Sequence, residues 1–424
     1  MLTALMIIAI GVGIGASMTM LTIFRAASGD PIPQKSAQLF NVQIDSYGPQ
    51  PGVPLAPDFL PYRLDYIDAL ALMRAHRAPR QVAMYPISVD IAPPDSQRDP
   101  VQANGHATYG DFFPMFDVPF EYGGSWGSAE DQSHAPVVVL TRRLNDQLFG
   151  GADSVGRTVT IEGDAYRVMG VMQTWRPTPP FYDLGSGGGR YTADDEFFLP
   201  FARAIDQHWR TAGGFGCPSR AGIIRGWDGM LTSPCVWIAL WVELPTAGSA
   251  AQYRAFLHNY ADSQRQSGRF NWPARVALRD VSQWLDYNHV VPPALTTLTG
   301  VSFAVLIVCL LNAAGLMLAK FMARIGSVAL RRALGATRPA IYAQCLMEAA
   351  MIGVAGAIVG IGLSETGLIT CRRVLPDDFA ILTHLRTGDI LIALLLAVFS
   401  ALAAGLYPIW RTSRVAYGAA LTGQ

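Results

Sequence analysis

The chain has 424 residues, of which 51% are hydrophobic and only 15% are charged. Its formal net charge at pH 7 is zero, which excludes the broad positive field by which proteins recruit nucleic acids. The cysteines form no CxxC pair, and no histidine lies beside them at metal-ligand spacing, so we expect no metal site. They are Cys217, Cys235, Cys309, Cys345 and Cys371.

Four apolar runs are long enough to cross a bilayer, which takes about 20 mostly apolar residues in a helix. The first run lacks a basic n-region and is too long for the h-region of a signal peptide, so we expect an uncleaved span. The sequence therefore predicts a membrane protein with four helical spans. The runs are Leu2–Phe24, Leu295–Leu318, Gln344–Thr370 and Ile390–Trp410.

Small and polar residues within these runs are candidates for helix packing. Gly11 and Gly15, and likewise Gly356 and Gly360, have the small-xxx-small spacing that lets helix backbones approach closely in lipid. The ordinary glycine content of membrane helices explains these pairs equally well. Polar side chains near the ends of the runs suit helix-packing hydrogen bonds at least as well as a transport role; these are Asn312, Glu348 and Glu365.

Loop charge predicts the orientation, because cytoplasmic loops are enriched in Lys and Arg. The loop after the third run is balanced in charge, and Arg25, just after the first run, is an exception to the rule. The loop after the second run and the C-terminus should be cytoplasmic, so residues of about 26 to 293 should lie outside. The basic residues that decide this are Lys320, Arg324, Arg331, Arg332, Arg338, Arg411 and Arg414.

The exported region has the patterns of a mixed α and β domain. Strand–helix–strand units at both of its ends predict two related α/β subdomains, with a less regular insertion between them. The expected elements are a helix over 64–75, a strand over 135–141, a short helix ended by Gly150, a hairpin turned at 162–164, a strand over 236–244, a helix over 250–264 and a strand over 274–281.

Cys217 and Cys235 both fall in the exported region, where disulfides persist. We expect a bridge between them, with two free thiols as the alternative. The stretch 183–190, DLGSGGGR, is glycine-rich, but neither a lysine nor a helix opening with Ser or Thr follows it. We therefore interpret it as a flexible loop and not as a phosphate-binding loop.

Catalytic motifs are not found in the sequence. A Walker A motif needs Gly-Lys-Ser/Thr, and neither Lys35 nor Lys320, the two lysines of the chain, follows a glycine. No GxSxG, HExxH or protein-kinase signature occurs either. We expect no catalytic, cofactor-binding or metal-binding residue, and ATP hydrolysis would need a separate subunit.

Two stretches carry a resemblance to one family, the MacB/FtsX-like ABC-transporter permeases. The stretch VVVLTRRLNDQLFGGADSVGRTVTIEGDAYRVMGVM, residues 137–172, resembles the core signature of that family's periplasmic domain, and 109–126 resembles the segment just upstream. Residues 311–360 are similar to the end of the second span, the coupling segment and the third span. The C-terminal AGLYPIWRTSRVAYGAAL resembles the closing helix, so the resemblance covers nearly the whole chain.

The resemblance implies a four-helix membrane protein with a large α+β periplasmic domain, made of a two-part porter domain and an inserted subdomain, in a bacterial inner membrane. The predicted segments are transmembrane helix 1 (1–25), the periplasmic MacB-like core domain (26–293), transmembrane helix 2 (294–319), a cytoplasmic coupling segment (320–342), transmembrane helix 3 (343–370), a periplasmic loop (371–389), transmembrane helix 4 (390–410) and a cytoplasmic C-terminus (411–424).

It also implies partners: cytosolic ABC ATPase subunits that bind ATP and Mg²⁺, and a second permease, identical or related. A periplasmic adaptor and an outer-membrane channel remain open. The expected function is export or efflux of drugs, peptides or lipids by mechanotransmission. The alternatives are an FtsX-like regulator of a periplasmic partner such as a cell-wall hydrolase, and a permease that extracts lipoproteins.

The coupling segment is expected to dock on the ATPase as a short helix along the membrane. Arg324 and Arg331, seven residues apart, should share one face, and Leu330 should lie off it as an anchor. Pro339 suits the first turn of the next helix. Ser327 stands where the family usually has Glu, which removes one expected contact. The alternative is a loop bound only to lipid headgroups. The residues expected to couple are Arg324, Arg331, Arg332, Leu334, Gly335 and Arg338.

Overall fold

The chain divides into two compact units in the computed structural model. We call them the helix unit, formed by Met1–Gly29 and Val291–Gln424, and the sheet unit, formed by Asp30–Val290. The structure describes residues 1–50, 59–92, 99–184, 195–324, 326–327, 330–331, 334–374, 388, 390–399 and 401–402.

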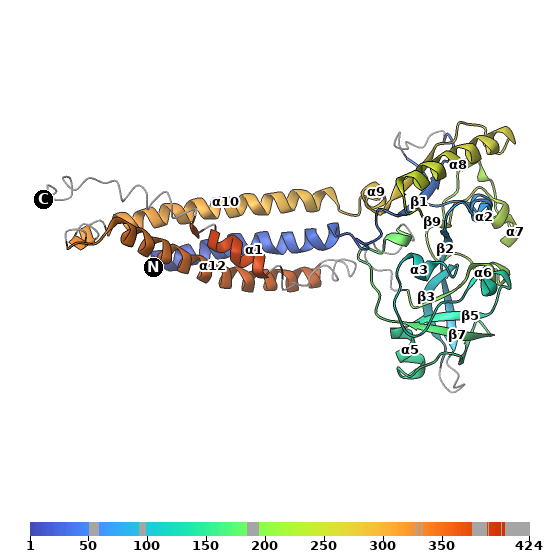
Figure 1. Ribbon diagram of the computed structural model, residues 1–424, viewed down its shortest axis with the longest axis horizontal. Coiled ribbons are helices and arrows are strands. Elements are labelled where there is room, and N and C mark those ends of the chain that lie inside the picture. Colours follow the sequence, from blue (N-terminus) through green and yellow to red (C-terminus); the bar gives the residue numbers. More distant parts are fainter. Residues whose placement is uncertain are drawn as a thin grey trace. The chain divides into compact units, whose positions relative to one another are not determined.

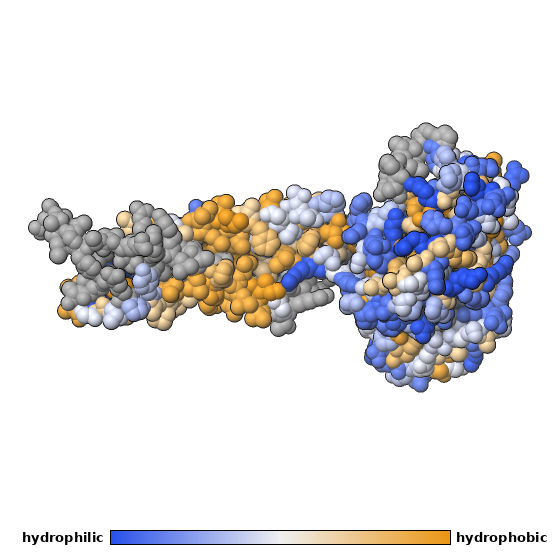
Figure 2. Space-filling view, turned by 45° about the horizontal axis from the view of Figure 1, so that its top comes forward, coloured by the Kyte–Doolittle hydropathy of each residue, from blue (hydrophilic) through white to orange (hydrophobic). Residues whose placement is uncertain are grey.

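Three helices in the described part of the helix unit are long and apolar enough to cross a membrane. They are α1 (Leu2–Ser28), α10 (Pro293–Met322) and α12 (Arg338–Val374), and each extends beyond the apolar run that predicted it. Figure 1 shows them running side by side, and Figure 2 shows hydrophobic residues gathered over this unit. The first three predicted spans are therefore confirmed as long apolar helices.

The fourth predicted span is only partly described. A shorter apolar helix covers Ile390–Phe399, and residues from 403 to the end of the chain lie outside the described residues, together with most of the predicted periplasmic loop. The structure thus supports three candidate spans, and four is not confirmed.

The helix α1 lies against both α10 and α12 and supplies the centre of the helix unit's core. Its residues Met6, Ile10, Ile14 and Met18, each four positions apart, are almost completely buried. A four-residue spacing keeps side chains on one helix face, so α1 turns this stripe toward its neighbours. The partners in the same cluster include Leu306, Ala313 and Met317 of α10 and Ala349, Ile352 and Ala357 of α12.

The sheet unit is built on one mixed sheet of ten strands, in which β10-β1-β9-β2-β3-β8-β5-β7-β4 are neighbours and β6 pairs with β2 and β7. The strands are β1 (Leu39–Ile44), β2 (Arg80–Ala92), β3 (Val101–Thr108), β4 (Phe120–Gly123), β5 (Val137–Thr141), β6 (Thr158–Ile161), β7 (Asp164–Met172), β8 (Phe197–Pro200), β9 (Ala239–Glu243) and β10 (Val276–Asp280).

Eight α-helices are described around this sheet. The helix expected over 64–75 is α2, and the helix expected over 250–264 is α8, which extends at both ends. The helices are α2 (Tyr66–Ala75), α3 (Phe112–Met115), α4 (Ser128–Gln132), α5 (Arg142–Phe149), α6 (Phe201–Asp206), α7 (Gly226–Thr232), α8 (Ala247–Gln266) and α9 (Val281–Tyr287), with 3₁₀ turns η1 (Phe181–Asp183) and η2 (Ser219–Ala221).

The long strand β2 joins the two parts of the sheet. Its first part, Arg80–Met84, pairs with β9, and its second part, Tyr85–Ile91, pairs with β3. The expected two subdomains are therefore not separated by a linker, because one continuous strand belongs to both.

Local turn chemistry explains the elements that the sequence predicted best. The helix α5 ends at Gly150, whose φ of 66° is the left-handed conformation that glycine adopts without steric cost. The hairpin of β6 and β7 turns at Glu162 and Gly163, with φ of 49° and 92°. Both predictions are confirmed. The glycine-rich stretch was predicted to be a loop, and most of it, 185–190, lies outside the described residues.

Candidate functional site

Two glycine pairs lie at the contact between α1 and α12. A Cβ added to Gly11 would lie 2.7 Å from Cγ1 of Val359, and one added to Gly360 would lie 3.1 Å from the backbone oxygen of Gly11. Gly15 and Gly356 face equally close atoms of the other helix. The predicted pairs meet each other, so they do more than reflect the ordinary glycine content of membrane helices.

Hydroxyl groups tie α1 to both neighbours, and the sequence analysis missed them. Ser17 Oγ donates to the backbone oxygen of Ser302 on α10 at 3.0 Å. Thr19 Oγ1 lies 3.4 Å from Ser364 Oγ on α12, in addition to its bond within α1. Thr19 follows Gly11 and Gly15 at four-residue spacing on the face toward α12, and this spacing is the signal that could have found it, whereas Ser17 lies on the face toward α10. Asn312 is exposed on α10 and makes no hydrogen bond with the described residues, so its role in helix packing stays a prediction.

A cluster of charges joins the end of α10 to the first part of α12. Lys320 Nζ lies 2.5 Å from Glu348 Oε1, and Arg324 lies 3.3 Å from the same oxygen. Lys320 also donates to Thr3 Oγ1 of α1 at 3.0 Å. The sequence contains no Asp or Glu from Lys320 to Gln344, and Glu348 is the first acidic residue after this segment. Glu348 therefore supplies the negative charge that Lys320 and Arg324 pair with. This carboxylate was expected only as a packing residue.

The sequence analysis expected Arg324 and Arg331 to share one face of a short helix, and the structure differs from this expectation. The helix α10 ends at Met322, and residues 323–324 form a turn, so Arg324 and Arg331 do not lie on one continuous helix. Arg324 instead has the intrachain partner Glu348. Because that carboxylate already partly neutralises Arg324, its charge is less available to another subunit than the sequence indicated.

The rest of the coupling segment presents an exposed surface. Leu330 and Leu334 are 63% and 81% exposed, and Arg331 is exposed with a hydrogen bond of 3.0 Å to Gln344 Oε1. Gly335 has a φ of 99°, which only glycine adopts easily, and α12 begins three residues later with Pro339 in its first turn. Arg332 lies outside the described residues, as does the side chain of Arg338.

The sheet unit contains a buried charged cluster that the sequence did not indicate. His106 on β3 bonds Asp183 through Nε2 and Asp195 through Nδ1, both at 2.7 Å. Arg63 pairs with Asp183 at 2.5 Å, and Tyr182 donates to Asp195 at 2.6 Å. Burial alone would lower the pKa of His106, but the two carboxylates offset it and raise the pKa to about 10. His106 is therefore protonated at neutral pH.

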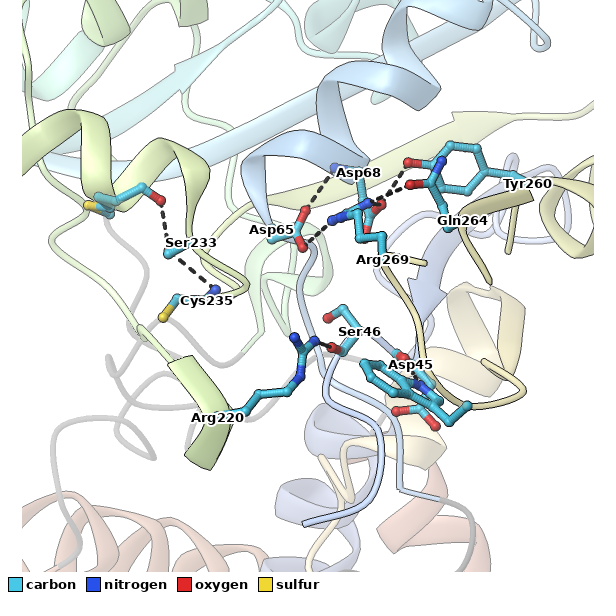
Figure 3. Close-up of polar contacts among 12 residues, drawn as sticks. Asp45, Ser46, Asp65, Asp68, Arg220, Ser233, Cys235, Tyr260, Gln264 and Arg269 are labelled. Carbon is cyan, nitrogen blue, oxygen red and sulfur yellow. Dashed lines mark hydrogen bonds and ion pairs between the residues drawn. The ribbon is translucent and has the colours of Figure 1, made fainter. Parts of the chain in front are cut away.

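A second buried cluster fastens α2 to the segment after α8 (Figure 3). Arg269 pairs with Asp65 at 2.6 Å and also with Asp68, which accepts from Tyr260 at 2.7 Å. Asp65 caps α2 by accepting from the backbone nitrogen of Asp68 at 2.8 Å. Burial and the neighbouring Asp68 raise the pKa of Asp65 to about 7, although Arg269 acts to lower it. These contacts suit a structural tie between distant segments.

Cys217 and Cys235, expected as a disulfide, are bonded to each other in the structure, with their Cα atoms 4.2 Å apart. Cys235 is completely buried, and its backbone nitrogen donates to Ser233 Oγ, as Figure 3 shows. Over the described residues, no group of three or more His, Cys, Asp or Glu side chains is arranged to hold a metal ion.

Two family models match this chain, one over its first part and one over its last part. A family model described as the MacB-like periplasmic core domain matches residues 3–254, which is more than half of the chain. A second model, the FtsX-like permease C-terminal region, matches residues 299–416. The two matches cover the regions in which the sequence resemblance was found, except for the last five residues of the C-terminal stretch.

The relatives are exporters with a longer chain. This chain is 22% identical over 352 residues to the macrolide export ATP-binding/permease protein MacB of Syntrophobacter fumaroxidans, covering 75% of this chain and 47% of that protein. It is 23% identical over 363 residues to the pyoverdine export ATP-binding/permease protein PvdT of Pseudomonas aeruginosa, covering 85% and 48%. The chain thus spans about half the length of the curated relatives it matches.

Among solved structures, the periplasmic region of MacB from Actinobacillus actinomycetemcomitans covers 60% of this chain and 94% of its own, at 12% identity and a TM-score of 0.37. The extracellular domain of the ABC-type transporter YknZ covers 56% and 99%, at 12% identity and a TM-score of 0.35. The family matches carry the assignment. The chain belongs to the MacB/FtsX-like ABC-transporter permeases, with a MacB-like periplasmic core domain and an FtsX-like permease region.

Proposed function

We propose that this chain is the membrane subunit of an exporter that passes the motion of a separate cytosolic ATPase to its periplasmic domain. The observation that carries the proposal is the exposed surface of Leu330, Arg331 and Leu334 beside the charge cluster at Glu348. An exposed basic and apolar surface of this kind suits a groove on another protein, where aliphatic and arginine side chains are buried together.

The C-terminal end of α10 and the first part of α12 are suited to transmit the motion of the ATPase to the helix unit. Lys320 and Arg324 both reach Glu348, so a force on the segment between the two helices would act on both. The close contact of α1 with α12 at Gly11 and Gly360 would carry α1 with them. Packed helices resist deformation, and they would therefore move largely as rigid bodies.

The remaining parts of the proposal come from the family and from the sequence. ATP and Mg²⁺ would be bound by the ATPase subunit, because neither lysine of this chain follows a glycine in a Walker A motif. A second permease copy, a fourth span over 390–410 and an inner-membrane location belong to the same proposal. The names of the relatives support export as the activity, with macrolides and pyoverdine as their own substrates.

Charge reversal at the coupling segment tests the proposal. The tagged chain is purified from its native host, and the co-purifying ATPase is quantified for the wild type, for Arg331→Glu and for Leu330→Ser combined with Leu334→Ser. We expect Arg331→Glu to lose the ATPase because an interface charge pair that loses one partner typically costs on the order of 2–5 kcal/mol. The double serine variant should lose it because it removes the apolar surface that the interface would bury. The control is Arg225→Glu, which reverses an exposed charge in the sheet unit.

Membrane insertion is checked in parallel by protease protection. If correctly inserted Arg331→Glu and the double serine variant retain the ATPase at the wild-type level, the segment is a lipid-facing loop and the proposal is wrong.

A further inference from the structure

The sheet unit contains a cavity of about 530 Å³ that neither charged cluster occupies. Its walls come from α2, from β2, from the segments 109–114 and 125–134, and from α6. Five separate parts of the chain thus converge on one hollow. A volume in this range is that of a small-molecule site.

The carboxylate of Asp131 on the cavity wall has no positively charged partner among the described residues. Asp131 accepts from the backbone nitrogen of Gly110 at 2.9 Å and from Trp126 Nε1 at 2.8 Å, both neutral groups, and it forms no ion pair with the described residues. Burial raises the pKa of Asp131 to about 6, so the carboxyl is mostly ionised at pH 7.5. A partly buried carboxylate with only neutral partners favours a cation.

Gln81 supplies a second and independent observation. Its side chain is 4% exposed and lines the cavity, and its Nε2 donates to the backbone oxygen of Met73. Its Oε1 is buried and has no hydrogen-bond partner among the described residues. A buried acceptor without a hydrogen-bond partner destabilises the folded protein, so a ligand that brings an N–H donor to this oxygen would offset that cost.

Three aromatic side chains also belong to the wall. Tyr66, Tyr109 and Trp126 line the cavity, and aromatic rings can attract cations and cover apolar groups. Asp111 adds another carboxylate on the wall, while Asp206 is paired with His134 at 2.5 Å. Arg74 also lines the cavity, is exposed and forms no ion pair with the described residues. Asp131 and Asp111, neither of which forms an ion pair with the described residues, outnumber this one guanidinium.

We propose that this cavity binds an organic cation, a protonated amine carried on an apolar body that contains a ring. The ammonium N–H groups would bond Asp131 and Gln81 Oε1, and the ring would lie against the aromatic walls. The inference goes beyond the proposed function, because binding here requires neither an ATPase nor transport, and either proposal can fail without the other.

The test uses the full-length chain in lipid nanodiscs and three probes of nearly equal shape: tryptamine, its neutral alcohol analogue tryptophol, and the anion indole-3-propionate. Saturation-transfer difference NMR at pH 7.5, with empty nanodiscs subtracted, gives the affinity of each probe. We expect tryptamine to bind about tenfold more tightly than tryptophol, which corresponds to about 1.4 kcal/mol, and the anion to bind more weakly than both.

Variants locate the binding. Asp131→Asn and Asp111→Asn should each weaken tryptamine about fivefold or more and leave tryptophol nearly unchanged, because only the charged probe loses an ion pair. Arg74→Ala should tighten tryptamine by removing a like charge. Asp153→Asn, at an exposed aspartate that does not line the cavity, is the matched control.

Asp131 also holds Gly110 and Trp126, so the Asp131→Asn protein is checked by circular dichroism. If it unfolds, Asp111→Asn and Arg74→Ala decide the matter, since both residues are exposed. The proposal is overturned if the three probes bind alike, or if tryptamine gives no saturable signal up to about 10 mM. Preferential binding of indole-3-propionate that Arg74→Ala abolishes would identify an anion site instead and would overturn it too.

Discussion

Glu348 Oε1 lies 2.5 Å from Lys320 Nζ and joins α12 to the end of α10 across 28 positions of the sequence. The side chains of Lys320 and Glu348 are only 11% and 24% exposed, so their attraction is weakly screened. Arg324, which is 56% exposed, adds a weaker contact to the same carboxylate.

Glu348→Gln should therefore destabilise the helix unit. It leaves Lys320 without its charged partner, and we expect a loss of about 1–3 kcal/mol, the cost of stranding a partly buried polar group. Thermal unfolding of the purified protein in detergent measures the effect. Glu365→Gln is the control. Glu365 lies on the same helix as Glu348 and forms no ion pair with the described residues. Equal shifts for the two variants would contradict the structural role of the cluster.

Gly360→Val should disrupt the contact between α1 and α12. A Cβ at this position would lie 2.8 Å from Cγ2 of Ile14, so a branched side chain requires the helices to separate. Overpacking of this kind typically costs about 1–3 kcal/mol. Gly362→Val is a close control, because a Cβ there meets nothing within 4 Å. Both variants are compared by thermal unfolding, and the prediction is wrong if the control is as unstable as Gly360→Val.

Removal of the disulfide should weaken the sheet unit. Cys217 and Cys235 are separated by 18 positions, and closing a loop of about this length stabilises a protein by about 3 kcal/mol in the chain-entropy model. Cys217→Ser should lower the unfolding temperature of the sheet unit, and adding reductant should not lower it further. Non-reducing mass spectrometry checks the bond itself. Two freely alkylated thiols in protein kept from reductant would refute it.

The His106 cluster predicts a fall in stability at alkaline pH. The pKa of His106 is about 10 in the folded protein and about 6.5 in an unfolded chain. A raised pKa contributes stability that is complete below pH 6.5 and is lost as the pH rises through 10. The pKa of Asp65 is raised to about 7, so its titration changes the stability of the protein mainly below pH 7. The change in stability from pH 7.5 to 10 therefore reports mainly on His106.

Unfolding temperatures are measured across that window for the wild type and for His106→Gln. The variant should be less stable at pH 7.5 and should lose less stability as the pH rises. Parallel curves for the two proteins would show that His106 is not protonated in the folded state.

The predicted orientation can be tested by cysteine labelling. In a background in which Cys309, Cys345 and Cys371 are replaced by serine, single cysteines are introduced at Gln252 and at Arg331, both exposed. A membrane-impermeant maleimide applied to spheroplasts should label position 252 and not position 331, because the positive-inside rule assigns the basic segment to the cytoplasm. Labelling of position 331 before the membrane is broken would reverse the topology.

Local features could be predicted from the sequence because neighbouring residues decide them. Long apolar runs determine α1, α10 and α12, since a helix satisfies its own backbone hydrogen bonds within the segment. The end of α5 at Gly150 and the turn at Gly163 depend on the freedom of glycine at positive φ. The two motif-bearing stretches also sufficed to indicate the family.

Contacts between distant positions were decided only by the tertiary structure. His106, Asp183 and Asp195 come from separate segments, and Glu348 meets Lys320 only because α12 lies beside the end of α10. The cavity likewise depends on five segments that the sheet brings together. Periodicity and composition describe one segment at a time, whereas the pairing of side chains across a fold depends on how the segments pack. For this reason the sequence determined the three long apolar helices and indicated the family, and only the packed chain determined which charges meet.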